Sequence, residues 1–584
     1  MLNFNFKTMK FIRFKYIERI IRITVVIFLL QSCNEKLNLI PEDFISDASF
    51  WKTENDFKIA ATNFYFTLKG WQSEPDGESD LMTTCQYFNS ISDGSYITSE
   101  QSSTWDNAYK DIRGFNYLIA KREGYKGNTT DIDRYIGEAK FFRAYVYFNL
   151  LKNYGGVPII LEPLDTDSEE LYKKRDTREA VVDQIITDLD ASIAVLPSES
   201  DIVDQDKGRI SKQGAQGFKA RVALYEGTWQ KFRENHERAE ILLQYVVNAS
   251  NNVINSGEFE LFKALGDSSY KYLFLIDNNA IAKSNPLGLN KSDNKEYIIM
   301  KKYSYELGIT NGHSHALYMR IAPTKKMADM YLCSDGLPIN KSPLFLGKGT
   351  MTSEYKNRDL RLQNSFMIPG KRYYSYGALG RDFDNSDNPG EGMGLHKAVF
   401  GANTCTGYSI IKTVTEKKDI SSGLEEADYP VLRYSEILLI YAEAKYELDG
   451  YISDADLDKS LNIVRDRVNM PHLTNTFIST NGLNMREEIR RERAVELLIE
   501  GFRLDDLKRW KTAEIEMPKS LRGIKYTNTE YEENPDFDKL DQFDNEGFYV
   551  WQFAENRSFE NKHYLFPLPT VQVDMMELQQ NPGW

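Results

Sequence analysis

Hydrophobic residues cover nearly every side of the stretch from residue 133 to residue 158. Positions 141–151 are almost all aromatic or aliphatic, so a helix here would have no wet face and should be buried among other helices. Gly155, Gly156 and Pro158 mark its end, because glycine can close a helix and proline cannot continue one. The pattern predicts the central helix of a helical array.

Helical periodicity recurs on both sides of this stretch. Thr53 is a candidate N-cap for the first helix, with Asp56 in its first turn. Helices are predicted over 49–68, 105–120, 177–196, 211–229, 236–249, 434–450, 457–471 and 484–510. The pair 434–450 and 457–471 has about the length of a tetratricopeptide unit. The predicted fold class is mostly α: a tetratricopeptide-like helical hairpin scaffold with a large irregular, loop-rich region and few short strands.

Two stretches interrupt the helices. Residues 71–104 form a loop rich in Ser, Gly, Asp and Thr, and residues 251–429 contain short runs bounded by Gly, Pro, Asn and Asp. Within the second stretch, 273–282 and 296–309 are predicted strands. Long irregular segments often carry function, so ligand-binding residues are expected in these two stretches.

A series of charged residues near the end of the helical part is spaced for pairing. Arg493, Glu496, Glu500, Arg503 and Asp506 follow one another at intervals of three or four positions. Residues at that spacing are neighbours on a helix surface. The series therefore predicts structural ion pairs along the helices rather than an active site.

The N-terminus has the pattern of an export signal. Basic residues between positions 7 and 22 precede a short apolar run, 23–30, which is too short to remain in a membrane as a spanning helix. Leu30-Gln31-Ser32-Cys33 resembles a bacterial lipobox, in which the cysteine thiol receives a lipid. We predict lipid attachment at Cys33. An ordinary secretory signal that happens to end in cysteine is the alternative.

Three cysteines follow Cys33, namely Cys85, Cys333 and Cys405. They are far apart, and no CxxC motif occurs, so neither a metal knuckle nor a disulfide framework is expected. At most one disulfide can form among them. Buried free thiols are the simpler interpretation.

Charge and motifs limit the functional classes. The formal net charge is −14, so binding of nucleic acid through bulk charge is not expected. The sequence contains no phosphate-binding glycine loop, no HExxH and no G-x-S-x-G motif. His313 and His315 lack a third ligand at metal-site spacing and are interpreted as ordinary loop histidines. We predict no cofactor, no metal and no enzymatic activity.

Several segments, taken in order, resemble the SusD/RagB outer-membrane lipoproteins of Bacteroidota. They are the lipobox, FWKTENDF, EAKFFRAYVYFNLLKNYGGVPI, YPVLRYSEILLIYAEAKYELDG, LNIVRDRV, IRRERAVELLIEGFRLDDLKRW and YLFPLPTVQVDMMELQQNPGW. The resemblance implies a helical core with an irregular ligand-binding face. It also implies an outer-membrane, lipid-anchored location facing the cell exterior, and a SusC-type TonB-dependent transporter as partner.

The resemblance divides the chain as follows. Residues 1–32 would be a lipoprotein signal peptide, 33–48 the lipid anchor and tether, 49–250 the N-terminal helical region and 251–584 the C-terminal region. Within the last, about 251–430 would be the irregular ligand-binding part and about 431–513 the helical part, followed by an irregular tail.

A glycan site needs aromatic rings that stack on sugar C–H faces and polar side chains that bind hydroxyls. Such residues occur together in the loop 71–104 and in the irregular middle, and a further tyrosine group lies at 373–376. Each ring is also a candidate for ordinary half-buried packing. The candidate ligand-binding residues are Trp71, Asp93, Tyr96, Tyr303, Tyr305, Tyr318 and Arg320.

The expected function is binding of nutrient glycan and its delivery to the SusC-type transporter. Three alternatives stay open on the sequence. The same architecture could bind oligopeptides, as a RagB-like branch of the family does. A tetratricopeptide adaptor would bind only proteins, and a surface glycoside hydrolase would release sugar.

Overall fold

A computed structural model describes residues 50–72, 74–278, 288–313, 320–369, 404–414, 423–535 and 539–584. Cys33, Tyr318, His315 and the tyrosines at 373–376 lie outside these ranges. The described part is mostly helical, which confirms the predicted fold class. None of its helices is both long enough and apolar enough to cross a membrane.

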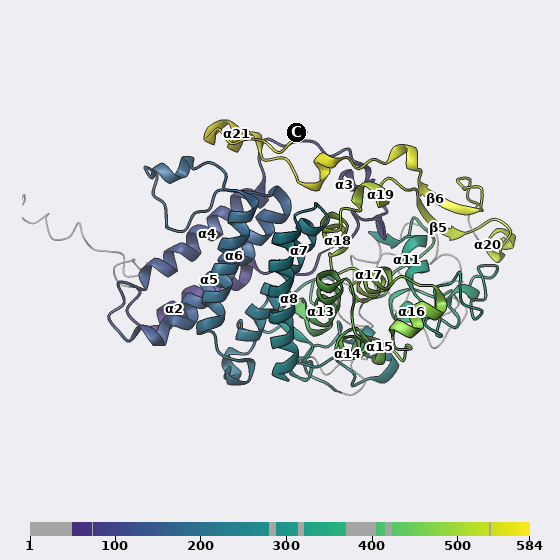
Figure 1. The fold of residues 1–584 in the computed structure, drawn as a ribbon, viewed down its shortest axis with the longest axis horizontal. Coiled ribbons are helices and arrows are strands. Elements are labelled where there is room, and N and C mark those ends of the chain that lie inside the picture. Colours follow the sequence, from purple (N-terminus) through teal and green to yellow (C-terminus); the bar gives the residue numbers. More distant parts are fainter. Residues whose placement is uncertain are drawn as a thin grey trace, which may run out of the picture.

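The N-terminal half is an array of helices in which each packs against the next (Figure 1). Its long helices are α2 (Glu54–Phe64), α4 (Ser103–Lys121), α5 (Thr129–Tyr154), α6 (Arg178–Val195), α7 (Lys212–Lys231) and α8 (His236–Ser256). Thr53 caps α2 through a capping box with Asp56, as predicted. These helices correspond to five of the predicted segments and to the central stretch, with ends shifted by a few residues.

Helix α5 is buried on all sides, as its composition predicts. It ends where expected: Gly155, with φ of 76°, donates its N–H to the carbonyl of Leu151 at 2.9 Å. Glu138 and Arg143 are the surprise in this helix because both are buried. Arg143 pairs with Asp188 at 2.6 Å, and Glu138 with an arginine from the loop before α7. Burial of these charges is tolerated because each has a partner.

The helices of the C-terminal part begin with α13 (Tyr434–Asp449). This helix packs against α8, α7 and α17 (Met485–Glu496). The predicted helix 457–471 is two short helices, α14 (Asp454–Asp458) and α15 (Leu461–Asp466), and 484–510 is α17 followed by α18 (Arg503–Arg509). Shorter helices are α3 (Ser90–Asp93), α9 (Ser269–Tyr272), α11 (Lys325–Met330), α12 (Leu360–Ser365), α16 (Asn475–Asn481), α19 (Ala513–Glu516), α20 (Glu530–Glu533) and α21 (Thr570–Met576).

Three two-stranded antiparallel sheets occur in the described part of the chain. They pair β1 (Met82–Thr84) with β3 (Ile321–Pro323), β2 (Tyr297–Lys301) with β4 (Tyr429–Arg433), and β5 (Leu521–Lys525) with β6 (Phe548–Gln552). The prediction of a strand within 296–309 is confirmed by β2. The prediction for 273–282 is wrong over its described residues 273–278, where an apolar run after α9 forms turns and is buried. Periodicity alone does not separate these two cases.

The charged series after residue 490 is structural, as expected, but most of its ion pairs do not follow the helical spacing. Glu496 and Glu500 both pair with Arg433, at 2.6 and 2.7 Å, and Arg503 pairs with Asp80 at 2.7 Å. These partners come from other elements because α17 ends at Glu496 and the chain turns before α18 begins. Asp506, in contrast, pairs within the series, with Arg493 and with Arg509 three positions further on, each at 2.9 Å. Helical spacing therefore identified the charges but only some of the contacts.

The largest hydrophobic cluster extends through both halves. Its members run from Phe57 in α2 to Leu578 after α21, with α5, α7, α8 and α13 in the middle. A smaller cluster lies in the loop-rich half, around β1, β3 and β5. The C-terminal segment crosses from β6 back to α21 beside the first helices, at the top of Figure 1. The C-terminal segment therefore connects the loop-rich half to the helical scaffold.

Candidate ligand-binding site

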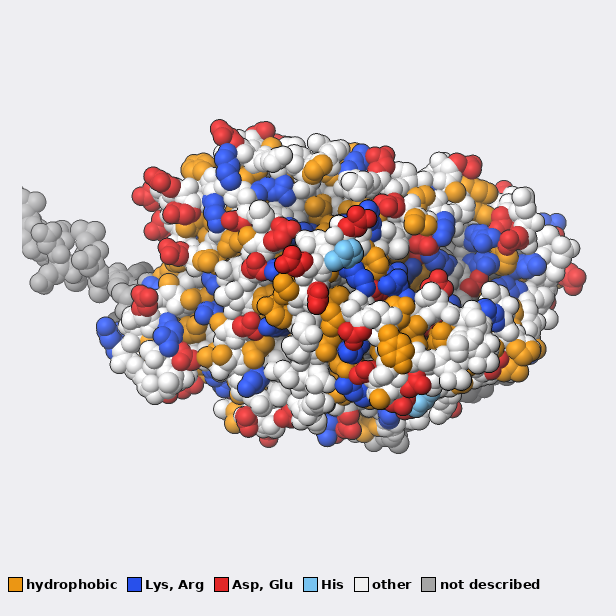
Figure 2. Space-filling view, in the orientation of Figure 1, with side chains coloured by type: hydrophobic (Ala, Val, Ile, Leu, Met, Phe, Trp, Pro, Cys, Tyr) orange, Lys and Arg blue, Asp and Glu red, His pale blue; other side chains and the backbone are white. Residues whose placement is uncertain are grey.

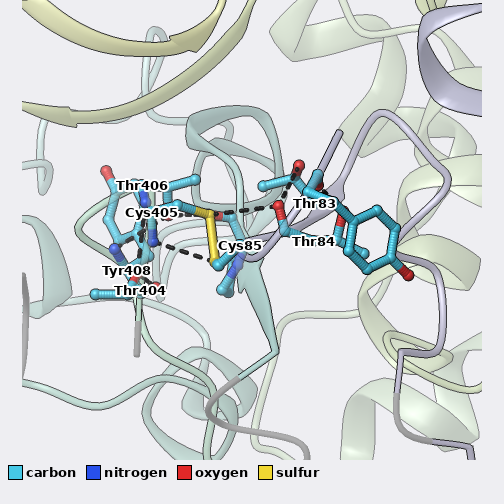
Figure 3. Close-up of a disulfide and its surroundings, with 9 residues drawn as sticks. Thr83, Thr84, Cys85, Thr404, Cys405, Thr406 and Tyr408 are labelled. Carbon is cyan, nitrogen blue, oxygen red and sulfur yellow. Dashed lines mark hydrogen bonds between the residues drawn. A yellow bond between two sulfur atoms is a disulfide. The ribbon is translucent and has the colours of Figure 1, made fainter. Parts of the chain in front are cut away.

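The first loop, 71–98, joins the helical half to the loop-rich half through strand β1. Thr83 lies opposite Ala322 in the β1–β3 pair, and Cys85, just after β1, donates its N–H to the carbonyl of Arg320 at 2.8 Å. Cys85 is also joined to Cys405 by a disulfide (Figure 3). Two contacts, one covalent, therefore hold this loop against residues more than two hundred positions away.

Threonines surround the disulfide on both sides (Figure 3). Thr84 donates its hydroxyl to the carbonyl of Tyr87 at 2.6 Å, and Thr406 donates to the carbonyl of Pro323 at 2.7 Å. These hydrogen bonds satisfy backbone carbonyls that the short strands leave unpaired. The loop beyond Cys85 thus starts from a fixed position.

The disulfide agrees with the limit of one bridge set by the sequence, but the interpretation as free thiols is wrong for Cys85 and Cys405. Cys333 is a buried free cysteine. Sequence reasoning could not choose the pair, because only the fold brings residue 85 within reach of residue 405.

Tyr87, two residues after Cys85 in the chain, is exposed and contacts a charged pair. Tyr87 is 48% exposed and donates its hydroxyl to Glu74. Arg320 lies on the other carboxylate oxygen of Glu74, at 3.6 Å. The hydrogen bond to Glu74, together with partial burial, raises the pKa of Tyr87 to about 12. The tyrosine therefore keeps its proton at neutral pH.

A second pair of rings lies next to this tyrosine in the chain. Phe88 is 51% exposed, and its ring centroid is 5.4 Å from that of Trp551 on strand β6. Exposed aromatic rings, a carboxylate and a guanidinium are the kinds of group that sugar recognition needs. We call this set the Tyr87 surface: Glu74, Tyr87, Phe88, Arg320 and Trp551.

Trp71 has a different environment. Its ring stacks on His313 with centroids 4.2 Å apart, and its Nε1 donates to the carbonyl of Ala427 at 2.8 Å. His313 is buried, which lowers its pKa to about 4, so it is neutral and hydrogen-bonds Thr413 at 2.6 Å. Trp71 thus anchors the start of the first loop to the middle of the chain.

Tyr303 and Tyr305 lie beside this anchor. The hydroxyl of Tyr303 accepts from the N–H of Trp71 at 3.4 Å, and a Cβ at Gly70 would lie 2.3 Å from the same oxygen. Any larger residue at position 70 would therefore displace the hydroxyl of Tyr303. Tyr305 is 58% exposed, and its N–H donates to Glu426 at 3.0 Å. The structure brings three of the predicted residues together: Trp71, Tyr303 and Tyr305.

Asp93 and Tyr96 lie against the C-terminal segment. The ring of Tyr96 is 5.1 Å from that of Phe566 and 6.1 Å from that of Trp584, and burial raises its pKa. Asp93 accepts from the N–H of Ser95 at 2.9 Å. Arg320, by contrast, joins the Tyr87 surface. The predicted residues within the described ranges thus fall in three places.

Sequence analysis missed Glu74, Tyr87, Phe88 and Trp551. The adjacent aromatics at 87 and 88 in a polar loop were the available signal, but an apolar run in a loop is equally consistent with burial. In the part of the chain that the structure describes, no group of three or more His, Cys, Asp or Glu side chains is placed to hold a metal ion.

Comparison with known proteins gives a consistent result. The profile described as "SusD family" matches residues 281–584, and one described as "Starch-binding associating with outer membrane" matches residues 62–224. SusD-like protein P38 of Formosa agariphila is 24% identical over 540 residues, which cover 88% of this chain and 94% of that protein.

Solved structures share the fold. A SusD-like carbohydrate binding protein from Bacteroides fragilis is 22% identical with a TM-score of 0.69, over 90% of this chain and 99% of that one. Surface glycan-binding protein A from Bacteroides fluxus is 19% identical with a TM-score of 0.57, over 91% and 100%. The first profile covers more than half of the chain, and the chain belongs to the SusD family.

Proposed function

We propose that this protein is a surface lipoprotein that binds nutrient glycan and delivers it to a SusC-type TonB-dependent transporter of the outer membrane. The Tyr87 surface carries the proposal, because an exposed tyrosine there contacts a carboxylate that is paired with a guanidinium, and a second exposed ring follows it in the chain. The names of the two solved relatives, one carbohydrate-binding and one glycan-binding, support the ligand class. The role is capture rather than chemistry.

Each part of the surface has a separate task in the proposal. Tyr87 and Phe88 would stack on sugar C–H faces, where they exclude water from one side of the ligand. Glu74 would accept from sugar hydroxyls and Arg320 would donate to them. Hydrogen bonds to charged groups contribute more than neutral ones, about 1.5–3 kcal/mol each. Their fixed geometry would set which hydroxyl pattern fits.

The remaining predicted residues extend the site in the proposal. Tyr305 offers an exposed ring on the side of Trp71 and Tyr303, and Tyr96 and Asp93 lie on the side of the C-terminal segment. A glycan of several units could contact more than one of these places. Tyr318 is retained as a candidate.

The binding test uses purified residues 34–584 on a glycan array and in affinity gels. We expect saturable binding of one sugar class, weakened about tenfold, or about 1.4 kcal/mol, by Tyr87→Ala and by Phe88→Ala. Tyr172→Ala is the matched control, because Tyr172 is an exposed tyrosine on the helical half. Trp71→Ala and Tyr96→Ala run in parallel to test the sequence-derived residues.

Three results would contradict the proposal. Binding that survives all four site substitutions would place the ligand elsewhere. Absence of glycan binding, followed by saturable binding from an oligopeptide pool, would replace the ligand class with peptide. Released reducing sugar would show a hydrolase instead.

The anchor and the partner are tested in cells. Cys33→Ala should abolish palmitate labelling and move the protein out of the outer-membrane fraction, while Cys333→Ala should change neither. External protease should degrade the wild-type protein in intact cells.

Affinity purification should recover a TonB-dependent barrel in a stoichiometric amount. Palmitate labelling that persists in Cys33→Ala would refute the lipid anchor. Purification without a barrel would refute the transporter partner.

A further inference from the structure

A groove of about 350 Å³ opens between α2, the turn 204–209 and the end of β2. It shares no lining residue with the Tyr87 surface. Five basic side chains line it: Lys58, Lys207, Arg209, Lys301 and Lys302. Asp206 is the single acidic residue among its lining residues. This concentration of positive charge stands out in a chain with a net charge of −14.

Three of the five cations are already paired. Lys58 contacts Asp206 at 2.7 Å, and Arg209 makes a bidentate pair with Glu138. Lys207 lies 3.8 Å from a glutamate outside the groove. Asp206, the acidic residue that lines the groove, is thus already paired with Lys58.

Lys301 and Lys302 form no ion pair with any residue that the structure describes. Their ammonium groups donate to backbone carbonyls instead, Lys301 to Tyr65 and Lys302 to Lys207, each at 2.9 Å. The carboxylate of Asp428 also interacts electrostatically with Lys302, but Asp428 forms its ion pair with Lys291, at 3.0 Å. Partial burial lowers the pKa of Lys301, because a cation away from water loses hydration.

A second cleft shows what a charge-balanced site looks like in the same protein. It measures about 600 Å³ beside α11 and β5, where Figure 2 shows Lys and Arg side chains gathered on the surface. There Lys326 pairs with Asp80 and Glu516, and Arg522 pairs with Asp544 at 2.7 Å. Its cations are neutralised by carboxylates that line the same cleft. The groove at β2 lacks this compensation.

An aromatic wall completes the groove. Phe66 is 66% exposed, and the ammonium of Lys301 lies 4.9 Å from its ring centroid. Leu68, Met300 and Ile309 supply apolar surface below it. A ligand here would meet one apolar face and a rim of positive charge. Volumes from 300 Å³ upward are typical of small-molecule sites.

We propose that this groove binds an anionic saccharide unit, a sugar ring that carries a carboxylate or a sulfate ester. The ring would stack on Phe66, and the anion would lie between Lys301 and Lys302. The saccharide class rests on the proposed function, whereas the charge of the groove is an independent observation. The protein would then hold a longer acidic glycan at two separate places.

The backbone at Gly208 leaves space for the side chain of Lys302. Gly208 has φ of 96°, and a Cβ there would lie 2.6 Å from the Cδ of Lys302. Any larger residue would be strained and would push this lysine away. The shape also favours a sugar over a lipid surface, because the cations line a concave groove rather than a flat face.

The test titrates residues 34–584 with trigalacturonate and with a sulfated chondroitin disaccharide, using maltotriose as the neutral probe. The double variant Lys301→Gln/Lys302→Gln should weaken the anionic probe that binds by at least about tenfold. Lys263→Gln/Lys356→Gln removes the same charge at two exposed positions elsewhere and should change binding less than twofold. Raising the salt concentration should weaken the anionic interaction and reduce the difference between the variants.

Comparison with Tyr87→Ala separates this inference from the proposed function. Anion binding that persists in Tyr87→Ala supports the groove, and anion binding lost there overturns it by placing the anion at the Tyr87 surface. No binding of either anionic probe, equal binding of maltotriose at the groove, or unchanged affinity in the double variant also overturns it. Binding to phosphatidylglycerol vesicles that requires Lys301 and Lys302, without saccharide binding, would replace the ligand with a lipid surface.

Discussion

Arg433 sits at the centre of a buried ionic cluster. Its guanidinium contacts Glu296, Glu496 and Glu500 at 2.6–2.8 Å, and Arg467 contacts the first two of these glutamates as well. All five side chains are buried. Charges can be held away from water only when each has close partners, and removing one leaves the others uncompensated. At the scale of single residues, this cluster is where substitution should cost most.

Glu496→Gln should lower the free energy of unfolding by about 3–5 kcal/mol, because it leaves buried arginines without their counter-charge. Chemical denaturation monitored by circular dichroism measures the change. Glu240→Gln on the exposed face of α8 is the control and should stay within about 0.5 kcal/mol. A loss for Glu496→Gln no larger than that of the control would show that the cluster does not stabilise the fold.

Glu443 should give the protein a pH dependence in the acid range. Burial alone would raise its pKa, but Arg509, with bonds of 2.5 and 2.7 Å, lowers it to about 2. A carboxyl with a depressed folded-state pKa stabilises above its unfolded value of about 4.5 and loses that contribution as pH falls toward 2. The shift corresponds to about 3 kcal/mol.

The measurement compares unfolding of wild type and Glu443→Gln between pH 7 and pH 2. The difference should be constant above pH 5 and shrink as pH falls below 4.5. A difference that stays constant down to pH 2 would show that Glu443 is not ionised in the fold.

At the scale of elements, the first loop depends on contacts from the second half of the chain. Strand β1 is only three residues long and pairs with β3, which is equally short. Short pairs of this kind are weak on their own. The Cys85–Cys405 disulfide adds the constraint that holds the loop in place. The geometry of the Tyr87 surface therefore depends on that bond.

The double variant Cys85→Ser/Cys405→Ser should be less stable by about 2–5 kcal/mol and should be cleaved faster by protease within residues 85–98. Binding at the Tyr87 surface should fall, while the groove at β2 should be unaffected. Cys333→Ser is the control. Thiol counting on denatured, unreduced residues 34–584 should give one free thiol; three would show that the disulfide does not form.

Some elements could be predicted from sequence and others could not. Helices α5 and α13 were predictable because α5 is a long, almost continuous apolar run, α13 is amphipathic, and glycines mark the ends of both. The turns at 273–278 were mistaken for a strand because a short buried apolar run has no period of its own. The split between α17 and α18 was missed because helical spacing continues across the turn.

At the scale of the whole molecule, the two halves share one core. Helix α13 packs against α7 and α8, and strand β4 pairs with β2. The largest hydrophobic cluster draws residues from both halves. A long chain can bury enough surface for two separate cores, but this one joins them.

Residues 49–250 expressed alone should therefore not fold as they do in the whole protein, because the faces of α7 and α8 that meet α13 would be exposed. We expect aggregation, or a broad thermal transition without the cooperativity of residues 34–584. Scanning calorimetry and light scattering measure this. A soluble fragment with a sharp transition would show that the N-terminal region is an independent domain.

The kinds of residue in the candidate site could be predicted from the sequence, but the individual residues could not. The polar loop with aromatics at 71–104 stays the predicted place for the site, and Arg320 and Tyr303 contact residues of this loop. Exposure could not be predicted: Trp71 stacks on His313, whereas Tyr87 stands in solvent. The partner of each ring is far away in sequence, so no local pattern distinguishes a covered ring from a free one.

The sequence by itself determined the helical scaffold, the family and the overall acidity of the chain. These properties follow from local spacing, ordered motifs and composition, each of which can be counted along the chain. The tertiary structure alone decided which cysteines pair, which carboxylates neutralise which cations, and where positive charge is left over at Lys301 and Lys302. The physical reason is that pairing and exposure depend on distances in space, and folding brings together residues that are hundreds of positions apart.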